Sequence, residues 1–258
     1  MKKKGIYVLP TTFTLLNLSL GFFAIIEVFK SNFSNAAWAI VACHFCDVLD
    51  GRVARMTNTT SSFGIEFDSF ADWISFGIAP AIMMHQLILY QYGKLGFIIA
   101  LLFVISSCLR LARFNVKSLD GNNISDSYFV GLPTPAAGGI LAAFVLVYQL
   151  FYQEITAKTI PLLMQNVPIF AKSMPLFMFF LSIAMVSQVK WNNFKMIKFS
   201  RPKPFSSLVI VLIFGLLIYV YPENFIFLLY LAYIVWGLLG FVLRFRRFKG
   251  REIKNEKR

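Results

Sequence analysis

Acidic residues, cysteines and histidines are scarce in this chain. Its 258 residues include 12 Asp and Glu, 3 Cys and 2 His. Three cysteines cannot form a disulfide framework, and Cys43 and Cys46 of the CHFC stretch have no second cysteine pair with which to build a zinc site. These shortages exclude a disulfide scaffold and a zinc-finger module.

Hydrophobic residues, in contrast, make up 58% of the chain, and 29 of them are Phe. That share is too high for an ordinary soluble domain, and several apolar runs approach or exceed the roughly 18 residues that a helix needs to cross a bilayer. Strands of alternating polarity are absent, which argues against a membrane barrel. The sequence therefore predicts an all-α fold, a polytopic transmembrane helical bundle that forms one membrane domain over residues 1–258. Eight spans are expected, at about 8–28, 35–54, 64–90, 94–114, 134–152, 167–189, 204–221 and 223–244.

The net charge of +13 is unevenly distributed along the chain. With eight spans and the N-terminus inside, 21 of the 25 Lys and Arg fall on the cytoplasmic side. This asymmetry predicts that both termini are cytoplasmic. The basic tail, residues 244–258, would lie against an anionic leaflet. We therefore expect membrane lipids as partners, and no nucleic acid.

Four aspartates gather in one short stretch, DVLDGRVARMTNTTSSFGIEFDSFAD at 47–72. Charged residues at membrane depth cost about 2.5 to 3.5 kcal/mol each on insertion scales, so this stretch carries a burden on the order of 10 kcal/mol. The acids could lie in headgroup water or pair with Arg52 and Arg55. Their spacing indicates more than that.

The aspartates form two pairs on two neighbouring helices. Asp47 and Asp50 lie about 60° apart on the predicted second helix, and Asp68 and Asp72 are one turn apart on the third. The loop between these helices is short, so both pairs lie at the same membrane face and can converge. Converging carboxylates repel one another unless cations lie among them, and oxygen ligands without Cys or His favour Mg²⁺, Mn²⁺ or Ca²⁺ over zinc.

Small residues and an arginine accompany the acids. Gly51, Ala54 and Gly64 would let a bulky group approach the helices closely, and Arg55 offers a guanidinium suited to phosphate oxygens. Metals, a small-residue cleft and an arginine are typical of transfer at a phosphorus centre, and the membrane setting indicates a lipid substrate.

The whole stretch fits the pattern D-x2-D-G-x2-A-R-x8-G-x3-D-x3-D, which resembles the signature of the CDP-alcohol phosphatidyltransferases at every defined position. The resemblance implies a membrane enzyme with a six-helix core, here with two further C-terminal helices, that binds a CDP-linked lipid and two divalent cations, Mg²⁺ or Mn²⁺. It further implies three sets of site residues. The metal ligands would be Asp47, Asp50, Asp68 and Asp72, with Asp72 also the catalytic base; the CDP-lipid contacts would be Asp50, Gly51, Ala54, Arg55, Ser61 and Gly64.

Further stretches look like the phosphatidylserine synthase branch of this family, among them SCLRLARFN and FVGLPTPAAGG. That likeness implies CDP-diacylglycerol and L-serine as substrates, with phosphatidylserine and CMP as products. Arg110, Arg113 and Asn115 are then candidates for binding serine, because an arginine fork suits a carboxylate. Thr14 and Asn17 are candidates for lining the cleft, although such residues in membrane helices more often bond other helices.

Other functions stay open on the sequence. The same chemistry could use another acceptor alcohol, or an archaeal ether lipid as donor, as in archaetidylserine synthesis. An ion-coupled transporter is an alternative of another class, because it too would place acids in the membrane. We expect a homodimer in the cell (inner) membrane, as is common in the family, with the active site facing the cytoplasm.

Overall fold

We describe a computed structural model of the chain. The description covers residues 8–57, 61–119, 128–152, 161–187, 190–192, 212, 215–217 and 219–255.

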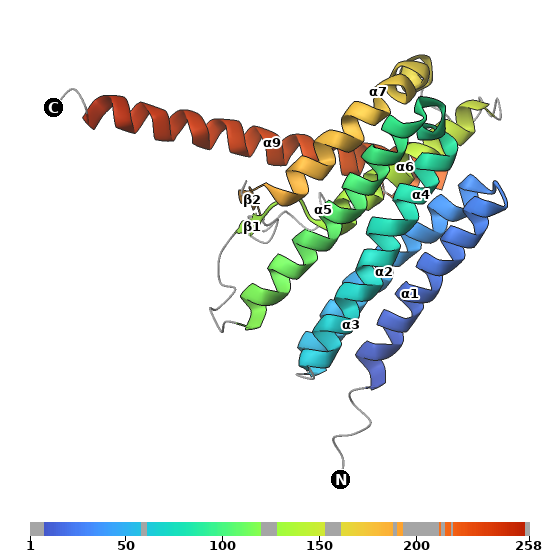
Figure 1. The fold of residues 1–258 in the computed structure, drawn as a ribbon, viewed down its shortest axis with the longest axis horizontal. Coiled ribbons are helices and arrows are strands. Elements are labelled where there is room, and N and C mark those ends of the chain that lie inside the picture. The colour runs from blue at the N-terminus through green and yellow to red at the C-terminus, as the bar shows by residue number, and fades with distance from the viewer. Residues whose placement is uncertain are drawn as a thin grey trace, which may run out of the picture.

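The first two helices form an antiparallel hairpin, α1 (Val8–Phe29) and α2 (Phe33–Thr57), which pack against each other along their length (Figure 1). Between them Ser31 has a φ of 60°, the left-handed conformation of a tight reversal. Glu27 lies inside this turn and accepts hydrogen bonds from Lys30 and Asn32, each at 2.9 Å. These bonds satisfy a carboxylate that is 4% exposed.

The third predicted helix, 64–90, is not one uniform helix. It consists of α3 (Ser62–Asp72), the π-helical turn η1 (Trp73–Ile78), α4 (Ala79–Leu87) and a 3₁₀ turn, η2 (Leu89–Tyr92). Pro80 has no N–H with which to bond the carbonyl of Phe76, so regular α-helical bonding is interrupted there. That carbonyl faces Gly138, where an added Cβ would lie 2.5 Å from the oxygen.

The remaining elements complete the bundle. They are α5 (Lys94–Leu119), β1 (Tyr128–Val130), α6 (Thr134–Tyr152), α7 (Pro161–Val186), β2 (Lys190–Asn192) and α9 (Pro222–Asn255). Helix α6 lies at the centre, where it contacts α2, α4, α7 and α9. β1 and β2 pair antiparallel with Phe129 opposite Trp191, a short pairing that the sequence did not predict. Beyond its packing on α6, α9 runs out of the bundle (Figure 1).

Among the described residues, five helices are long and apolar enough to cross a membrane, so the predicted helical membrane protein is confirmed at this level. Their spans are Thr12–Phe29, Lys94–Val116, Thr134–Tyr152, Val167–Val186 and Pro222–Gly240. The predicted spans 35–54 and 64–90 are helical but carry the acids of the 47–72 stretch. Most of the predicted span 204–221 lies outside the described residues, so the count of eight stays a prediction.

Candidate active site

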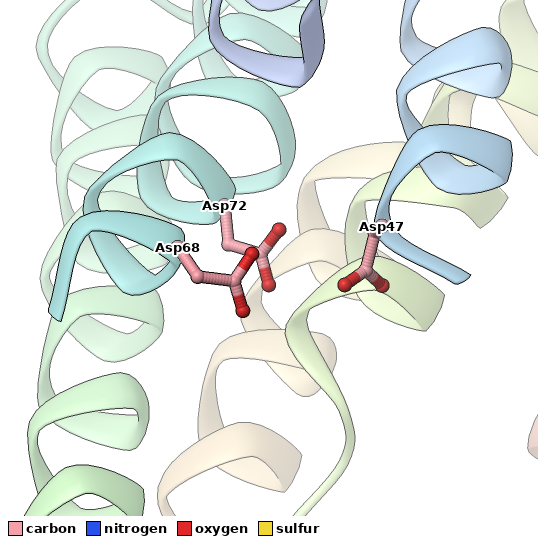
Figure 2. Close-up of side chains that lie close together, drawn as sticks. All are labelled: Asp47, Asp68 and Asp72. Atoms are coloured by element: carbon pink, nitrogen blue, oxygen red, sulfur yellow. The ribbon is translucent and has the colours of Figure 1, made fainter. Parts of the chain in front are cut away.

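Three of the four aspartates converge on one point. One carboxylate oxygen from each of Asp47, Asp68 and Asp72 lies within 4.8 Å of the others. Asp47 comes from α2, whereas Asp68 and Asp72 come from successive turns of α3. Figure 2 shows the last two side by side on one helix, with Asp47 reaching toward them from the other. The predicted convergence of two helices is therefore present in the structure for these three residues.

Asp72 is held from the side of α1. It is 7% exposed, and its Oδ1 accepts a hydrogen bond of 3.0 Å from Asn17 Nδ2. The backbone carbonyl of Asn17 in turn accepts bonds from Ser75 Oγ at 3.0 Å and Cys43 Sγ at 3.4 Å. Asn17 thus connects α1 to both helices that carry the carboxylates.

Asp50 lies beside the group but outside it. Its carboxylate accepts a hydrogen bond from Thr14 Oγ1 of α1, although its charge still acts on Asp68. Thr14 and Asn17 therefore both face the aspartates, and their predicted role in lining a cleft stays a prediction. Each of these α1 side chains bonds one aspartate.

The three-carboxylate group fits a divalent cation. Carboxylate oxygens are the ligands that Mg²⁺ and Mn²⁺ prefer, and Asp68 Oδ1 is buried with no hydrogen-bond partner among the described residues. A buried carboxylate oxygen without a donor costs free energy unless a cation takes the donor's place. Within the described residues, no other group of His, Cys, Asp and Glu side chains meets the same distance criterion.

The residues predicted to contact the nucleotide lie around the α2–α3 connection. Ser61 caps the N-terminus of α3, where its Oγ accepts a hydrogen bond of 3.0 Å from the N–H of Gly64. Gly51 follows Asp50 directly on α2. Ala54 and Arg55 belong to the same helix, but their side chains lie outside the described part of the chain.

The three residues predicted to bind serine have different surroundings. Arg110 Nη1 donates to Thr134 Oγ1 at 2.8 Å, and its charge interacts with Asp72 and Asp47. Arg113 Nη1 instead donates to the carbonyl of Val186 at 2.8 Å, at the end of α7. Of these two arginines, Arg110 is the one whose charge faces the aspartates.

Asn115 joins α5 to α3. It donates to Glu66 Oε2 at 3.0 Å and accepts from Ser69 Oγ at 2.9 Å. Both ends of its amide are therefore used in holding the helix that carries Asp68 and Asp72.

Comparison with known proteins identifies the family. The sequence profile of the CDP-alcohol phosphatidyltransferases matches residues 7–171, which include all three converging aspartates. The chain belongs to the CDP-alcohol phosphatidyltransferase family. Membership accounts for the acidic group, because the family is metal-dependent and Asp47, Asp68 and Asp72 could hold the ion.

Three relatives of this phosphatidyltransferase are named CDP-diacylglycerol–serine O-phosphatidyltransferase. The Helicobacter pylori protein is 36% identical over 235 residues, which cover 91% of each chain. The Bacillus subtilis protein is 34% identical over 140 residues, 54% of this chain and 76% of its own. The Methanocaldococcus jannaschii protein is 38% identical over 152 residues, 58% of this chain and 67% of its own.

The sequence reasoning missed residues that line the same region of this phosphatidyltransferase. Thr134, which bonds Arg110, was not among the predicted site residues. Tyr230 and Tyr233 of α9 are within electrostatic range of Asp47 and Arg110 respectively. Their signal was two hydroxyls three residues apart, on one face of the apolar stretch 225–243 of that helix.

Proposed function

We propose that this phosphatidyltransferase transfers a phosphatidyl group from CDP-diacylglycerol to L-serine, giving phosphatidylserine and CMP. The observation that carries the proposal is the convergence of Asp47 from α2 with Asp68 and Asp72 from α3, with Asp72 held by Asn17. The similarity to relatives named as serine phosphatidyltransferases supports serine as the acceptor.

Asp72 is the proposed general base. Its carboxylate takes the proton of the serine hydroxyl as that oxygen attacks the phosphorus attached to diacylglycerol. A new phosphorus–oxygen bond forms, the bond from this phosphorus to the bridging oxygen breaks, and the electron pair leaves with CMP. Asp47, Asp68 and Asp72 would hold Mg²⁺ or Mn²⁺, which when bound would neutralise the diphosphate charge. Asn17 holds Asp72 in the orientation that the proton transfer needs.

Arg110 is the proposed partner of the serine carboxylate. It reaches from α5 toward the aspartates, and its bond to Thr134 uses one of the five N–H groups of a guanidinium. Asp50, Gly51, Ala54, Arg55, Ser61 and Gly64 are proposed to contact the CDP-lipid. We also propose two cations, a homodimer, and an active site at the cytoplasmic face of the cell membrane.

A CMP-release assay with purified protein tests the proposed reaction. CMP should form only when CDP-diacylglycerol, L-serine and Mg²⁺ or Mn²⁺ are all present. Equal release with glycerol 3-phosphate or inositol would contradict the serine assignment. Parallel assays with a CDP-linked archaeal ether lipid test the donor. Metal flux in liposomes without CMP release would instead support a transporter.

Replacing the proposed base tests the mechanism. Asp72→Asn should lower kcat about 10²-fold to 10⁴-fold, the usual contribution of a positioned base. Glu223→Gln is the matched control, because it makes the same carboxylate-to-amide change in the first turn of α9 and should keep wild-type kcat. Wild-type turnover by Asp72→Asn would exclude Asp72 as the base.

A further inference from the structure

Helix α9 lies beyond residues 7–171, the part matched by the family profile, yet it reaches the candidate active site. Arg110 is the active-site residue that α9 approaches. Its guanidinium bonds Thr134 of α6, the charges of Asp72 and Asp47 act on it, and Tyr233 of α9 is within range of an electrostatic interaction with it. The last helix therefore comes close to the arginine that interacts with the aspartates.

Aromatic contacts fix how α9 lies on α6. Phe227 packs against Phe144, with ring centroids 6.5 Å apart. One turn further along α9, the ring of Tyr230 lies against Gly139, five residues earlier in α6. The residue number rises on α9 while it falls on α6, so the two helices run antiparallel at this contact.

The next turn of α9 points to the arginine. A step of three residues from Tyr230 gives Tyr233, about 4.5 Å further along α9. Following α6 in the same direction in space means stepping back in its residue numbers. Five residues before Gly139 is Thr134, the hydrogen-bond partner of Arg110. The register of the two helices therefore brings Tyr233 toward the bond between Arg110 and Thr134, in agreement with its electrostatic interaction with Arg110.

This alignment of α9 on α6 requires a glycine at position 139. A Cβ at that position would lie 2.3 Å from Cζ and 2.5 Å from the hydroxyl oxygen of Tyr230. A side chain there would displace the tyrosine ring, so the close approach of α9 depends on glycine. His44 of α2 packs edge-on against the same ring at 5.6 Å, which ties α9 to the helix that carries Asp47.

We propose that Tyr233 is a positioning residue that holds the Arg110 guanidinium toward the aspartates, where it binds the carboxylate of the acceptor. The inference rests on the proposed function, because it takes an amino acid as the acceptor. Tyr233 acts through Arg110 and does not itself touch the reacting atoms. It gives the last helix a part in acceptor selection.

Tyr233→Phe is the test, because it removes the hydroxyl and keeps the ring that packs against the bundle. Steady-state kinetics should show KM for serine raised about tenfold, which corresponds to about 1.4 kcal/mol of binding free energy, with KM for CDP-diacylglycerol within about twofold of wild type. Tyr219→Phe is the matched control, since Tyr219 is 85% exposed, and it should leave both constants unchanged.

A double-mutant cycle separates positioning from packing. In an Arg110→Lys background, Tyr233→Phe should add less than about twofold to KM for serine, because the geometry it maintains is already lost. Additive effects, an equal rise of both KM values, or an unchanged KM for serine would each overturn the inference. If wild-type protein releases no CMP with serine, the proposed function itself fails, and this outcome is distinct from the others.

Discussion

At the scale of single residues, Asn17 connects α1 to the three-carboxylate group through both its side chain and its backbone. Its Nδ2 donates to Asp72, and its carbonyl accepts from Ser75 and Cys43. A hydrogen bond to a charged group contributes roughly 1.5 to 3 kcal/mol. Asn17 is therefore expected to set the orientation of the proposed base.

Asn17→Ala should accordingly reduce kcat by about tenfold or more, because the carboxylate of Asp72 loses its donor. The KM for CDP-diacylglycerol should change little, and steady-state kinetics would show the separation. Ser19→Ala is the control on the same helix, because the exposed Ser19 hydroxyl bonds only the carbonyl of Leu15, one turn earlier. A wild-type kcat for Asn17→Ala would remove this residue from the mechanism.

The residue types and spacing predicted the acidic group but not every partner within it. Two aspartate pairs on adjacent helices were readable from helical periodicity, and three of the four carboxylates do converge. That Asp50 turns to Thr14 depends on how α1 is rotated against α2, which no local pattern specifies. The bonds of Asn115 to α3 likewise depend on a tertiary contact.

At the scale of elements, the π-helical turn after Asp72 is formed jointly by two helices. Pro80 releases the carbonyl of Phe76 from regular helical bonding, and Gly138 of α6 lets that carbonyl approach. The sequence shows the proline, but an apolar run from 64 to 90 looks the same with or without a π turn. The interruption was therefore missed, although the existence of the helix was predicted.

Gly138→Ala tests this contact. The added Cβ would lie 2.5 Å from the oxygen and 2.9 Å from the Cα of Phe76, both backbone atoms. Overpacking of this kind costs about 1 to 3 kcal/mol, so thermal unfolding in detergent should show a lower Tm, with lower activity because η1 follows Asp72 directly. Gly215→Ala should not lower Tm, since no described neighbour lies within 4 Å of its added Cβ and Ala favours a helix over Gly. Equal Tm values for the two variants would contradict the account.

At the scale of the whole molecule, the distribution of Lys and Arg predicts that the aspartates face the cytoplasm. Single cysteines at exposed positions, in a background without the three natural cysteines, can test this orientation. The two variants are Met56→Cys and Tyr90→Cys. Met56 lies near the end of α2 and is 83% exposed, whereas Tyr90 follows α4 and is 64% exposed. In intact spheroplasts a membrane-impermeant maleimide should label only the cysteine at 90, with the one at 56 labelled after permeabilisation. The reverse pattern would overturn the orientation.

Stability should also depend on divalent cations, because three carboxylates from two helices repel one another without one. A ligand that binds only the folded state stabilises it by about 2.7 kcal/mol at 100 times its Kd. We therefore expect Mg²⁺ or Mn²⁺ to raise Tm in a saturable manner, and chelation to lower Tm and abolish CMP release.

Asp68→Asn tests whether the stabilising cation binds at the aspartates. The substitution removes one of the repelling charges, so without metal the variant should be at least as stable as wild type, whereas with metal its Tm should rise much less. Glu223→Gln keeps all three aspartates and should retain the full metal-dependent rise in thermal unfolding scans. A rise of the same size in Asp68→Asn would mean that the stabilising cation binds elsewhere. A metal-free variant clearly less stable than wild type would mean that the Asp68 carboxylate stabilises the fold by itself.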